Sequence, residues 1–181
     1  DANGVTALMR ASYVHHTEDV GQLLAKGADV QAQDVWGWTP LMHASVRGHS
    51  EVVGQLLAKG ADVKVQDKNG VTALMHASFD GHSEVVGQLL AKGADVQAHS
   101  NDGVTALMHA SVRGHSEVVG QLLDKGADAQ TQDKDGATAS SLASVRGHTE
   151  VVKQLRVIEE IAAEKARKAE AAAAEKARKA E

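Results

Sequence analysis

The chain has 181 residues, of which 19 are Lys or Arg and 24 are Asp or Glu, and its net charge at pH 7 is −5. It contains no cysteine, which excludes a disulfide framework, thiolate chemistry and a cysteine-based metal site. No run is long and apolar enough to span a membrane and no signal sequence is visible, so we expect a cytoplasmic protein without membrane contact. The acidic balance also argues against nucleic-acid binding, which needs a basic surface.

A unit of 33 residues recurs five times along the chain. A glycine marks the same place in every copy, at Gly4, Gly37, Gly70, Gly103 and Gly136. A fixed period of this length is typical of a stacked repeat array. We therefore divide the chain into an array at 1–156, with units 1–33, 34–66, 67–99, 100–132 and 133–156, and a C-terminal extension at 157–181.

Each unit predicts two short helices and a projecting turn, and the second copy has the clearest signals. Thr39 is suited to cap the first helix, Pro40 to occupy its first position, and Gly48 to end it in a left-handed conformation. Ser50 is expected to cap the second helix, along which valine and leucine recur on one face. Residues 61–70 then form a turn and a short hairpin-like tip. One unit cannot bury its own apolar face, so neighbouring units must stack.

The first and fifth units carry polar substitutions that suit the two ends of a stack. Asp19 replaces a valine of the other copies, and Ser140 and Ser141 replace a Leu-Met pair. A face that no further unit covers requires such residues, so we expect these two units to act as caps.

The extension begins with aliphatic residues and continues as an alanine-rich segment. We expect Val157, Ile158 and Ile161 to lengthen the last helix and to cover the final unit. Beyond them an 11-residue motif of Ala, Glu, Lys and Arg occurs twice, which favours a continuous helix. Two interpretations stay open. The helix is either a solvated, semi-rigid spacer or an oligomerising helix whose seam past Ile161 offers only alanine.

Several motifs of the second copy resemble the ankyrin repeat: Gly37-Trp38-Thr39-Pro40-Leu41, Gly48-His49, Leu56-Leu57 and Gly60-Ala61-Asp62. The resemblance covers Asp1 to about Leu155 and implies an all-α ankyrin repeat solenoid, followed here by a C-terminal helical extension. The family's histidine stands one place later in this chain, at His43, His76 and His109. The resemblance also implies a concave binding groove lined by the turn tips and by the exposed side of each first helix.

Differences between near-identical copies mark positions that stacking does not fix. The four aromatic residues of the chain are such differences, and we expect none of them at a stacking position. Aromatic residues and arginine dominate the energetics of protein interfaces. We therefore predict that the concave face and turn tips of units 1–3 bind a protein partner through Tyr13, Trp36, Trp38, Arg47, Phe79, Asp80 and Arg113. The alternative is that one or two of the rings pack against the next repeat.

We expect no catalytic site, no cofactor and no metal site. Eight of the ten histidines recur at two fixed places of the unit, so the repeat architecture explains them. Neither set has the close spacing of a zinc site. The acidic residues recur as turn residues and not as a paired general acid and base. The chain is thus interpreted as a non-catalytic binding module, monomeric unless the extension mediates assembly.

Two other functions remain open at this point. The chain could be a structural spacer or assembly protein that acts through its C-terminal helix, or it could hold a small aromatic or nucleotide ligand against Trp36 and Trp38. The near-invariant frame with altered groove positions is also typical of an engineered ankyrin binder selected from a library. A natural protein with recently duplicated repeats would share that pattern.

Overall fold

The computed structural model describes residues 2–178, and this part of the chain forms ten α-helices. Their bounds are α1 (Ala7–Tyr13), α2 (Thr17–Ala25), α3 (Pro40–Val46), α4 (Ser50–Ala58), α5 (Ala73–Asp80), α6 (Ser83–Ala91), α7 (Ala106–Arg113), α8 (Ser116–Asp124), α9 (Ala139–Val145) and α10 (Thr149–Arg178). No strand forms among these residues, where only two isolated antiparallel bridges occur, Gln66 to Thr72 and His99 to Thr105.

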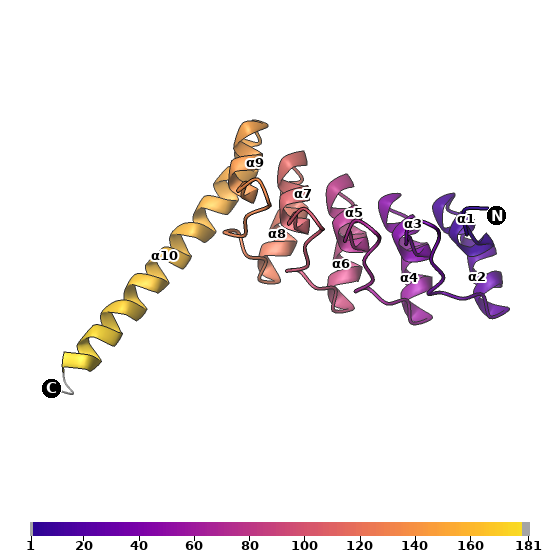
Figure 1. The fold of residues 1–181 in the computed structure, drawn as a ribbon, viewed down its shortest axis with the longest axis horizontal. Coiled ribbons are helices and arrows are strands. Elements are labelled where there is room, and N and C mark those ends of the chain that lie inside the picture. Colours follow the sequence, from indigo (N-terminus) through magenta and orange to yellow (C-terminus); the bar gives the residue numbers. More distant parts are fainter. Residues whose placement is uncertain (1, 179–181) are drawn as a thin grey trace.

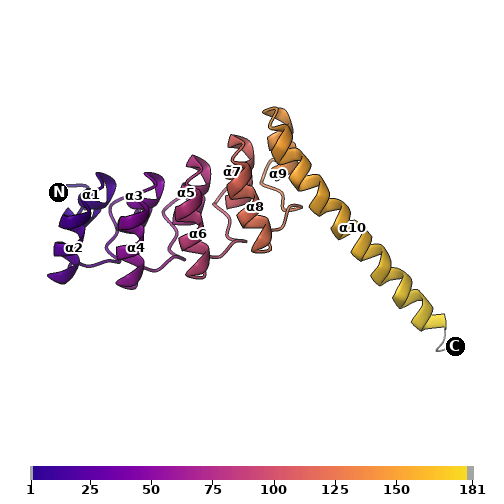
Figure 2. The same cartoon turned by 180° about the vertical axis from the view of Figure 1, so that it is seen from behind.

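The helices stand in two rows, as Figure 1 shows. The odd-numbered helices contact one another along an inner row, and the even-numbered helices contact one another along an outer row. Each odd helix also packs on the even helix that follows it. The view from behind shows the same succession of repeats, with the N-terminus and α10 at opposite ends (Figure 2). The expected all-α solenoid is confirmed.

The hydrophobic core lies between the two rows and runs the length of the array. In the second repeat, Leu41 and Met42 from α3 and Val52, Val53 and Leu56 from α4 are at most 1% exposed. The equivalent side chains of the third and fourth repeats are buried to the same degree. Full burial of such a side chain stabilises the fold by about 1.5–3 kcal/mol. Because these contacts cross from repeat to repeat, the stability of the array depends on stacking.

The predicted caps of the inner helices are confirmed, and the predicted cap of the outer helix is wrong. Oγ1 of Thr39 accepts the backbone N–H of Met42 at 3.3 Å, and Pro40 occupies the first turn of α3. Gly48 follows α3 in a left-handed conformation, with φ 69°. Ser50 already lies inside α4, whose N-cap is His49, and that histidine makes no side-chain cap hydrogen bond.

Histidines at the His49 position instead join one repeat to the previous one. The Nε2–H of His49 donates to the carbonyl oxygen of Tyr13 at 2.9 Å. The same bond recurs from His82 to Val46, from His115 to Phe79 and from His148 to Val112. The ring is therefore engaged in a bond between repeats and is not free to cap its own helix.

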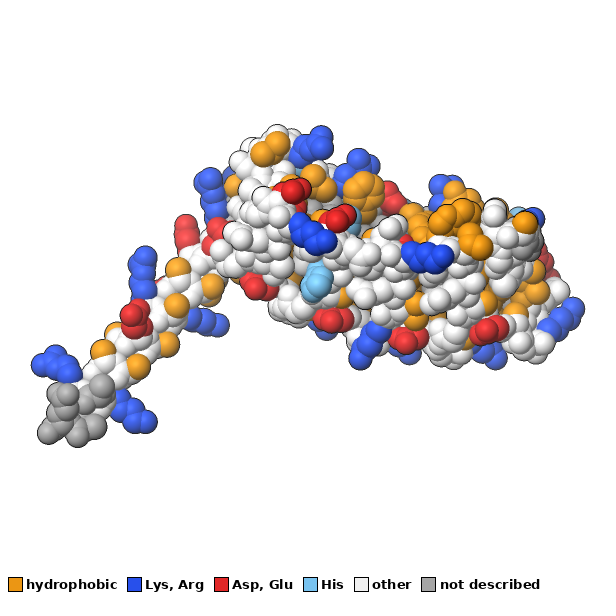
Figure 3. Space-filling model, in the orientation of Figure 1, with side chains coloured by type: hydrophobic (Ala, Val, Ile, Leu, Met, Phe, Trp, Pro, Cys, Tyr) orange, Lys and Arg blue, Asp and Glu red, His pale blue; other side chains and the backbone are white. Residues whose placement is uncertain are grey.

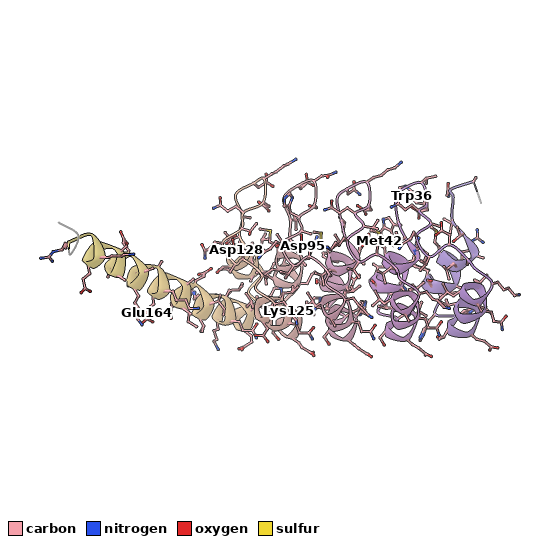
Figure 4. All side chains as sticks on the ribbon, turned by 90° about the horizontal axis from the view of Figure 1, so that it is seen from below. Trp36, Met42, Asp95, Lys125, Asp128 and Glu164 are labelled. Carbon is pink, nitrogen blue, oxygen red and sulfur yellow. The ribbon has the colours of Figure 1, made fainter. Side chains whose placement is uncertain are left out.

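The loop tips are connected by a second set of bonds between repeats. The backbone N–H of Lys68 donates to the carbonyl oxygen of Trp36 at 3.0 Å, and the N–H of Asn101 donates to that of Asn69 at 2.8 Å. Equivalent bonds join the first tip to the second and the fourth to the fifth. The loops therefore form a continuous row of fixed tips, which stand out from the helices in Figure 4.

Both ends of the array carry the expected polar faces. Asp19 on α2 is exposed, and its Oδ2 lies 3.2 Å from Nδ1 of His16. At the other end Ser141 is exposed, and its Oγ accepts the backbone N–H of Thr138 at 2.9 Å in a capping box at the start of α9. The interpretation of the first and fifth repeats as caps agrees with this geometry.

The last helix, α10, runs without interruption from Thr149 to Arg178 and projects away from the array (Figure 1). The aliphatic residues do lengthen this helix, but the expectation that they cover the final repeat is wrong. Val157, Ile158 and Ile161 are 54%, 38% and 47% exposed. Leu155 is the last fully buried residue of those that the structure describes, and α10 continues beyond the array (Figure 1).

Each outer helix of the first four repeats holds a glycine in its middle, for example Gly87 in α6 and Gly120 in α8. A methyl group at Gly87 would lie 3.6 Å from Oε1 of Gln121, an ordinary contact distance, and one at Gly120 would meet nothing within 4 Å. Glycine inside a helix costs about 1 kcal/mol relative to alanine. The packing therefore does not require these glycines.

We predict that Gly120→Ala increases the free energy of unfolding by about 1 kcal/mol, measured by denaturant titration of the helical signal. The contrasting change is Gly81→Ala. Gly81 has φ 76°, and a Cβ there would lie 2.5 Å from Nδ1 of His115. Gly81→Ala should therefore lower the free energy of unfolding by more than about 1 kcal/mol. A destabilised Gly120→Ala variant would show instead that the outer helices need glycine at this place.

Candidate functional site

The predicted site residues come from the inner helices and one loop tip. Tyr13 and Phe79 lie at the C-terminal ends of α1 and α5, and Trp36 and Trp38 lie in the loop between α2 and α3. In Figure 3 apolar side chains gather over α1 and α3. We call the exposed side of α1, α3, α5, α7 and α9, together with the loop tips beside it, the inner-helix face.

Trp36 is exposed on a backbone that is held firmly. Its indole is 54% exposed at the tip of its loop (Figure 4). Its backbone N–H donates to Oδ1 of Asp34 at 2.9 Å, and its carbonyl accepts the N–H of Lys68. A fixed backbone lowers the entropy lost when a partner covers the ring.

Trp38 corrects the expectation that no aromatic residue takes part in stacking. It is partly buried against the hydrophobic core. Its ring centroid lies 5.1 Å from that of His43 on α3 and 4.3 Å from that of His76 on α5. Gly37, with φ 83°, closes a tight turn between the two indoles, so they reach different surroundings. The two histidines occupy space beside the Trp38 ring, which disfavours a ligand stacked between the tryptophans.

Tyr13 and Phe79 form two similar clusters, two repeats apart. The guanidinium carbon of Arg47 lies 5.0 Å from the Tyr13 ring centroid, and that of Arg113 lies 4.8 Å from the Phe79 ring centroid. Both rings also meet a histidine edge-on at 88°, with centroid distances of 6.1 Å and 5.5 Å. The rings are 44% and 38% exposed. Each arginine predicted for the site thus lies over the ring of the preceding repeat.

Asp80 joins the first of these clusters and not the second. It lines a pocket of 580 Å³ together with Tyr13, Trp38, Arg47 and two further residues, Val46 and His82. Phe79 and Arg113 lie outside this pocket, and Trp36 stands apart at the loop tip. The structure therefore brings four of the seven predicted residues to one pocket.

A second pocket beside Tyr13 involves residues that sequence reasoning missed. It has a volume of 290 Å³ and is lined by Tyr13 and by Val5, Met9, Arg10, Val14 and His43. A signal for it existed, because Val14 stands where the later repeats have arginine or aspartate. Val14 is 52% exposed, so an apolar side chain borders solvent at this end of the inner-helix face.

One histidine on α3, His43, and one on α5, His76, contact the ring of Trp38. Nε2 of His43 is 3.2 Å from Oδ2 of Asp34, and Nε2 of His76 is 3.7 Å from Oδ2 of Asp67. Although shifted by one place, each histidine thus reaches the turn of its own repeat. Burial lowers the pKa of both histidines, because desolvation of the charged form outweighs the attraction of the carboxylate.

His109 on α7 lacks such a carboxylate. Ser100 stands where the second and third repeats have the aspartate. Its Oγ accepts the backbone N–H groups of Asp102 and Val104, and a serine has no second oxygen to offer a histidine. Burial, with a smaller effect from nearby His76, therefore lowers the pKa of His109 to about 4.

Neither a spanning helix nor a metal cluster emerges from residues 2–178. None of the helices there is long and apolar enough to cross a membrane. In the same residues, no three His, Asp or Glu side chains converge in a way that could hold a metal ion.

The repeat geometry and the shared caps point to a known family. A family model for ankyrin repeats, three copies in length, matches residues 8–100 and also residues 88–169. The chain belongs to the ankyrin repeat family. Ankyrin repeats are generally protein–protein interaction modules and are typically non-catalytic. A comparison with curated proteins finds no match to this ankyrin chain.

We predict that acid destabilises the ankyrin array through His109. Its pKa of about 4 in the folded chain lies below the ordinary value of 6.5. Between these values the unfolded chain binds a proton that the folded chain does not. The stabilisation of the fold by neutral His109 is therefore fully present above the pKa that this histidine has in the unfolded chain. It is lost as the pH falls through the pKa in the folded chain, which lowers the free energy of unfolding by on the order of 2–3 kcal/mol. Denaturant unfolding at a series of pH values measures this loss.

Two substitutions isolate the contribution of this histidine. His109→Gln removes the titrating group, and Ser100→Asp supplies the missing carboxylate, so both should reduce the loss of stability in acid. A pH dependence that is the same in His109→Gln as in the unmodified chain would show that other groups cause it.

Proposed function

We propose that the ankyrin array binds a protein partner through the inner-helix face and loop tips of repeats 1–3. The observation that carries the proposal is the exposure of Tyr13, Trp36 and Phe79 on this one face of a chain that has only four aromatic residues. None of these three rings is fully buried in the hydrophobic core. Aromatic rings that become buried in an interface each contribute about 2 kcal/mol or more in favourable cases.

The clusters at Tyr13 and Phe79 support the same proposal. Arg47 and Arg113 each lie over an aromatic ring, which limits the conformations of both partners of the pair before binding. In the proposed complex the two arginines are charged contacts, and Asp80 selects against partners that would place a negative charge directly against its own carboxylate. Trp38 contacts His43 and His76 and so holds the residues next to this surface in place.

Trp36→Ala should affect mainly the binding of a partner, and Trp38→Ala should affect mainly the stability of the array. Trp36→Ala should weaken binding by about 2 kcal/mol or more and leave unfolding within about 0.5 kcal/mol of the original. Trp38→Ala should lower the free energy of unfolding by more than about 1 kcal/mol, because it removes packing against the core. Calorimetry with the captured partner measures affinity, and denaturant titration measures stability.

The partner for this measurement is obtained with the full chain as bait. Parallel baits carry Tyr13→Ala with Phe79→Ala, or Glu51→Ala and Glu84→Ala on the outer helices as matched controls. A protein that binds the inner-helix face is retained by the original chain and by the outer-helix control, and is lost from the aromatic double variant. Equal retention by all three baits would contradict the proposal.

The second candidate function is assembly through α10. It is favoured by the exposure of Ile158 and Ile161 on α10, the helix that projects from the array (Figure 1). If these residues mediate assembly, the chain should sediment as an oligomer, and Ile158→Glu with Ile161→Glu should sediment as a monomer. A monomer in both cases removes this candidate and agrees with the prediction of a monomeric chain.

A further inference from the structure

The charges of the array are unevenly placed. The array is acidic overall, yet every arginine before Arg156 lies in the last turn of an inner helix or caps its end: Arg10, Arg47, Arg113 and Arg146. The outer helices instead carry a glutamate in each first turn, from Glu18 to Glu150. The inner-helix face therefore carries four arginines, on or at the ends of α1, α3, α7 and α9, whereas α5 has Asp80 at the place of Arg47 and Arg113.

Arg47 and Arg113 have no carboxylate partner among residues 2–178, where the ion pairs involve other side chains. Each guanidinium lies over an aromatic ring of the preceding repeat. A stacked guanidinium still presents N–H groups at its edge, in the fork that matches a carboxylate. The two sites are oriented donors that pair with no acid in the part of the chain that the structure describes.

Apolar surface runs beside these arginines. One residue of each inner helix forms a ridge along the face: Tyr13, Val46, Phe79, Val112 and Val145. At its N-terminal end lies the 290 Å³ pocket, where Val5, Met9 and Val14 contribute aliphatic walls. A pocket of that kind accepts an aliphatic side chain.

We propose that the partner of this face is an acidic protein segment with aliphatic side chains. Its carboxylates pair with Arg47 and Arg113, its aliphatic residues lie along the ridge, and one of them enters the pocket beside Tyr13. Asp80 lies between the two arginines in sequence and lines the pocket of Arg47. The residue of the bound segment that faces Asp80 must therefore be neutral or basic. This inference rests on the proposed function and adds the chemistry of the partner to it.

Single-stranded nucleic acid also combines negative charge with groups that stack on aromatic rings. The face favours a peptide for two reasons. The pocket beside Tyr13 has aliphatic walls from Val5, Met9 and Val14, which match an aliphatic side chain, and a nucleotide lacks such a group. A phosphate backbone carries a charge at every nucleotide, whereas a peptide can place a neutral residue against Asp80.

The test is selection of displayed random peptides on the immobilised full chain. We expect the enriched peptides to be rich in Asp and Glu together with Leu, Ile or Met. Arg47→Ala and Arg113→Ala should each reduce the binding of an enriched peptide about tenfold, the effect of losing one charged hydrogen-bonding partner. Lys59→Ala and Lys92→Ala, each of which removes one positive charge from the end of an outer helix, should each leave binding unchanged.

The outcomes separate the two proposals. Enriched peptides that are lost on Tyr13→Ala with Phe79→Ala but show no acidic bias would overturn the inferred chemistry and leave the proposed function standing. Peptides that bind equally well to that double variant would overturn both. An oligothymidylate that competes with the enriched peptides at similar concentration would overturn the acidic segment in favour of single-stranded nucleic acid.

Discussion

Stacking of one repeat on the next is the interaction on which the rest of the structure depends. A pair of helices as short as α3 and α4 has too little surface to enclose Leu41, Met42 and Leu56 by itself. The following repeat completes the enclosure, and bonds from the His49 position and from the loop tips hold the two in register. The same frame then decides which side chains stay outside.

A few residues take part in the contacts between repeats and also lie at the inner-helix face. Trp38 is the clearest of these, because it lies between two frame histidines and lines the pocket of Arg47. His109 is another, since it packs edge-on against Phe79 and has no carboxylate beside it. Partner binding and acid sensitivity are therefore expected to be coupled at repeats 3 and 4, where His109 contacts the exposed ring of Phe79.

Much of this fold could be predicted because the period repeats the same local signals. Thr39, Pro40 and Gly48 act through their nearest neighbours in the chain, and their effects were predicted correctly. Ser50 was assigned wrongly as a cap because the competing use of His49, a bond to another repeat, involves a residue 36 positions away. Trp38 and the aliphatic residues of α10 were placed wrongly for a similar reason. Their burial depends on where a helix or loop lies in space, which local patterns do not encode.

We infer that stacking accounts for what the repeats share and leaves the inner-helix face free for a partner. Amide hydrogen exchange of the full chain, with and without the protein that it captures, tests this directly. We expect slower exchange in the loop around Trp36 and at the ends of α1, α3 and α5, with α4 and α6 unchanged. Slower exchange confined to the outer helices or to α10 would contradict the claim.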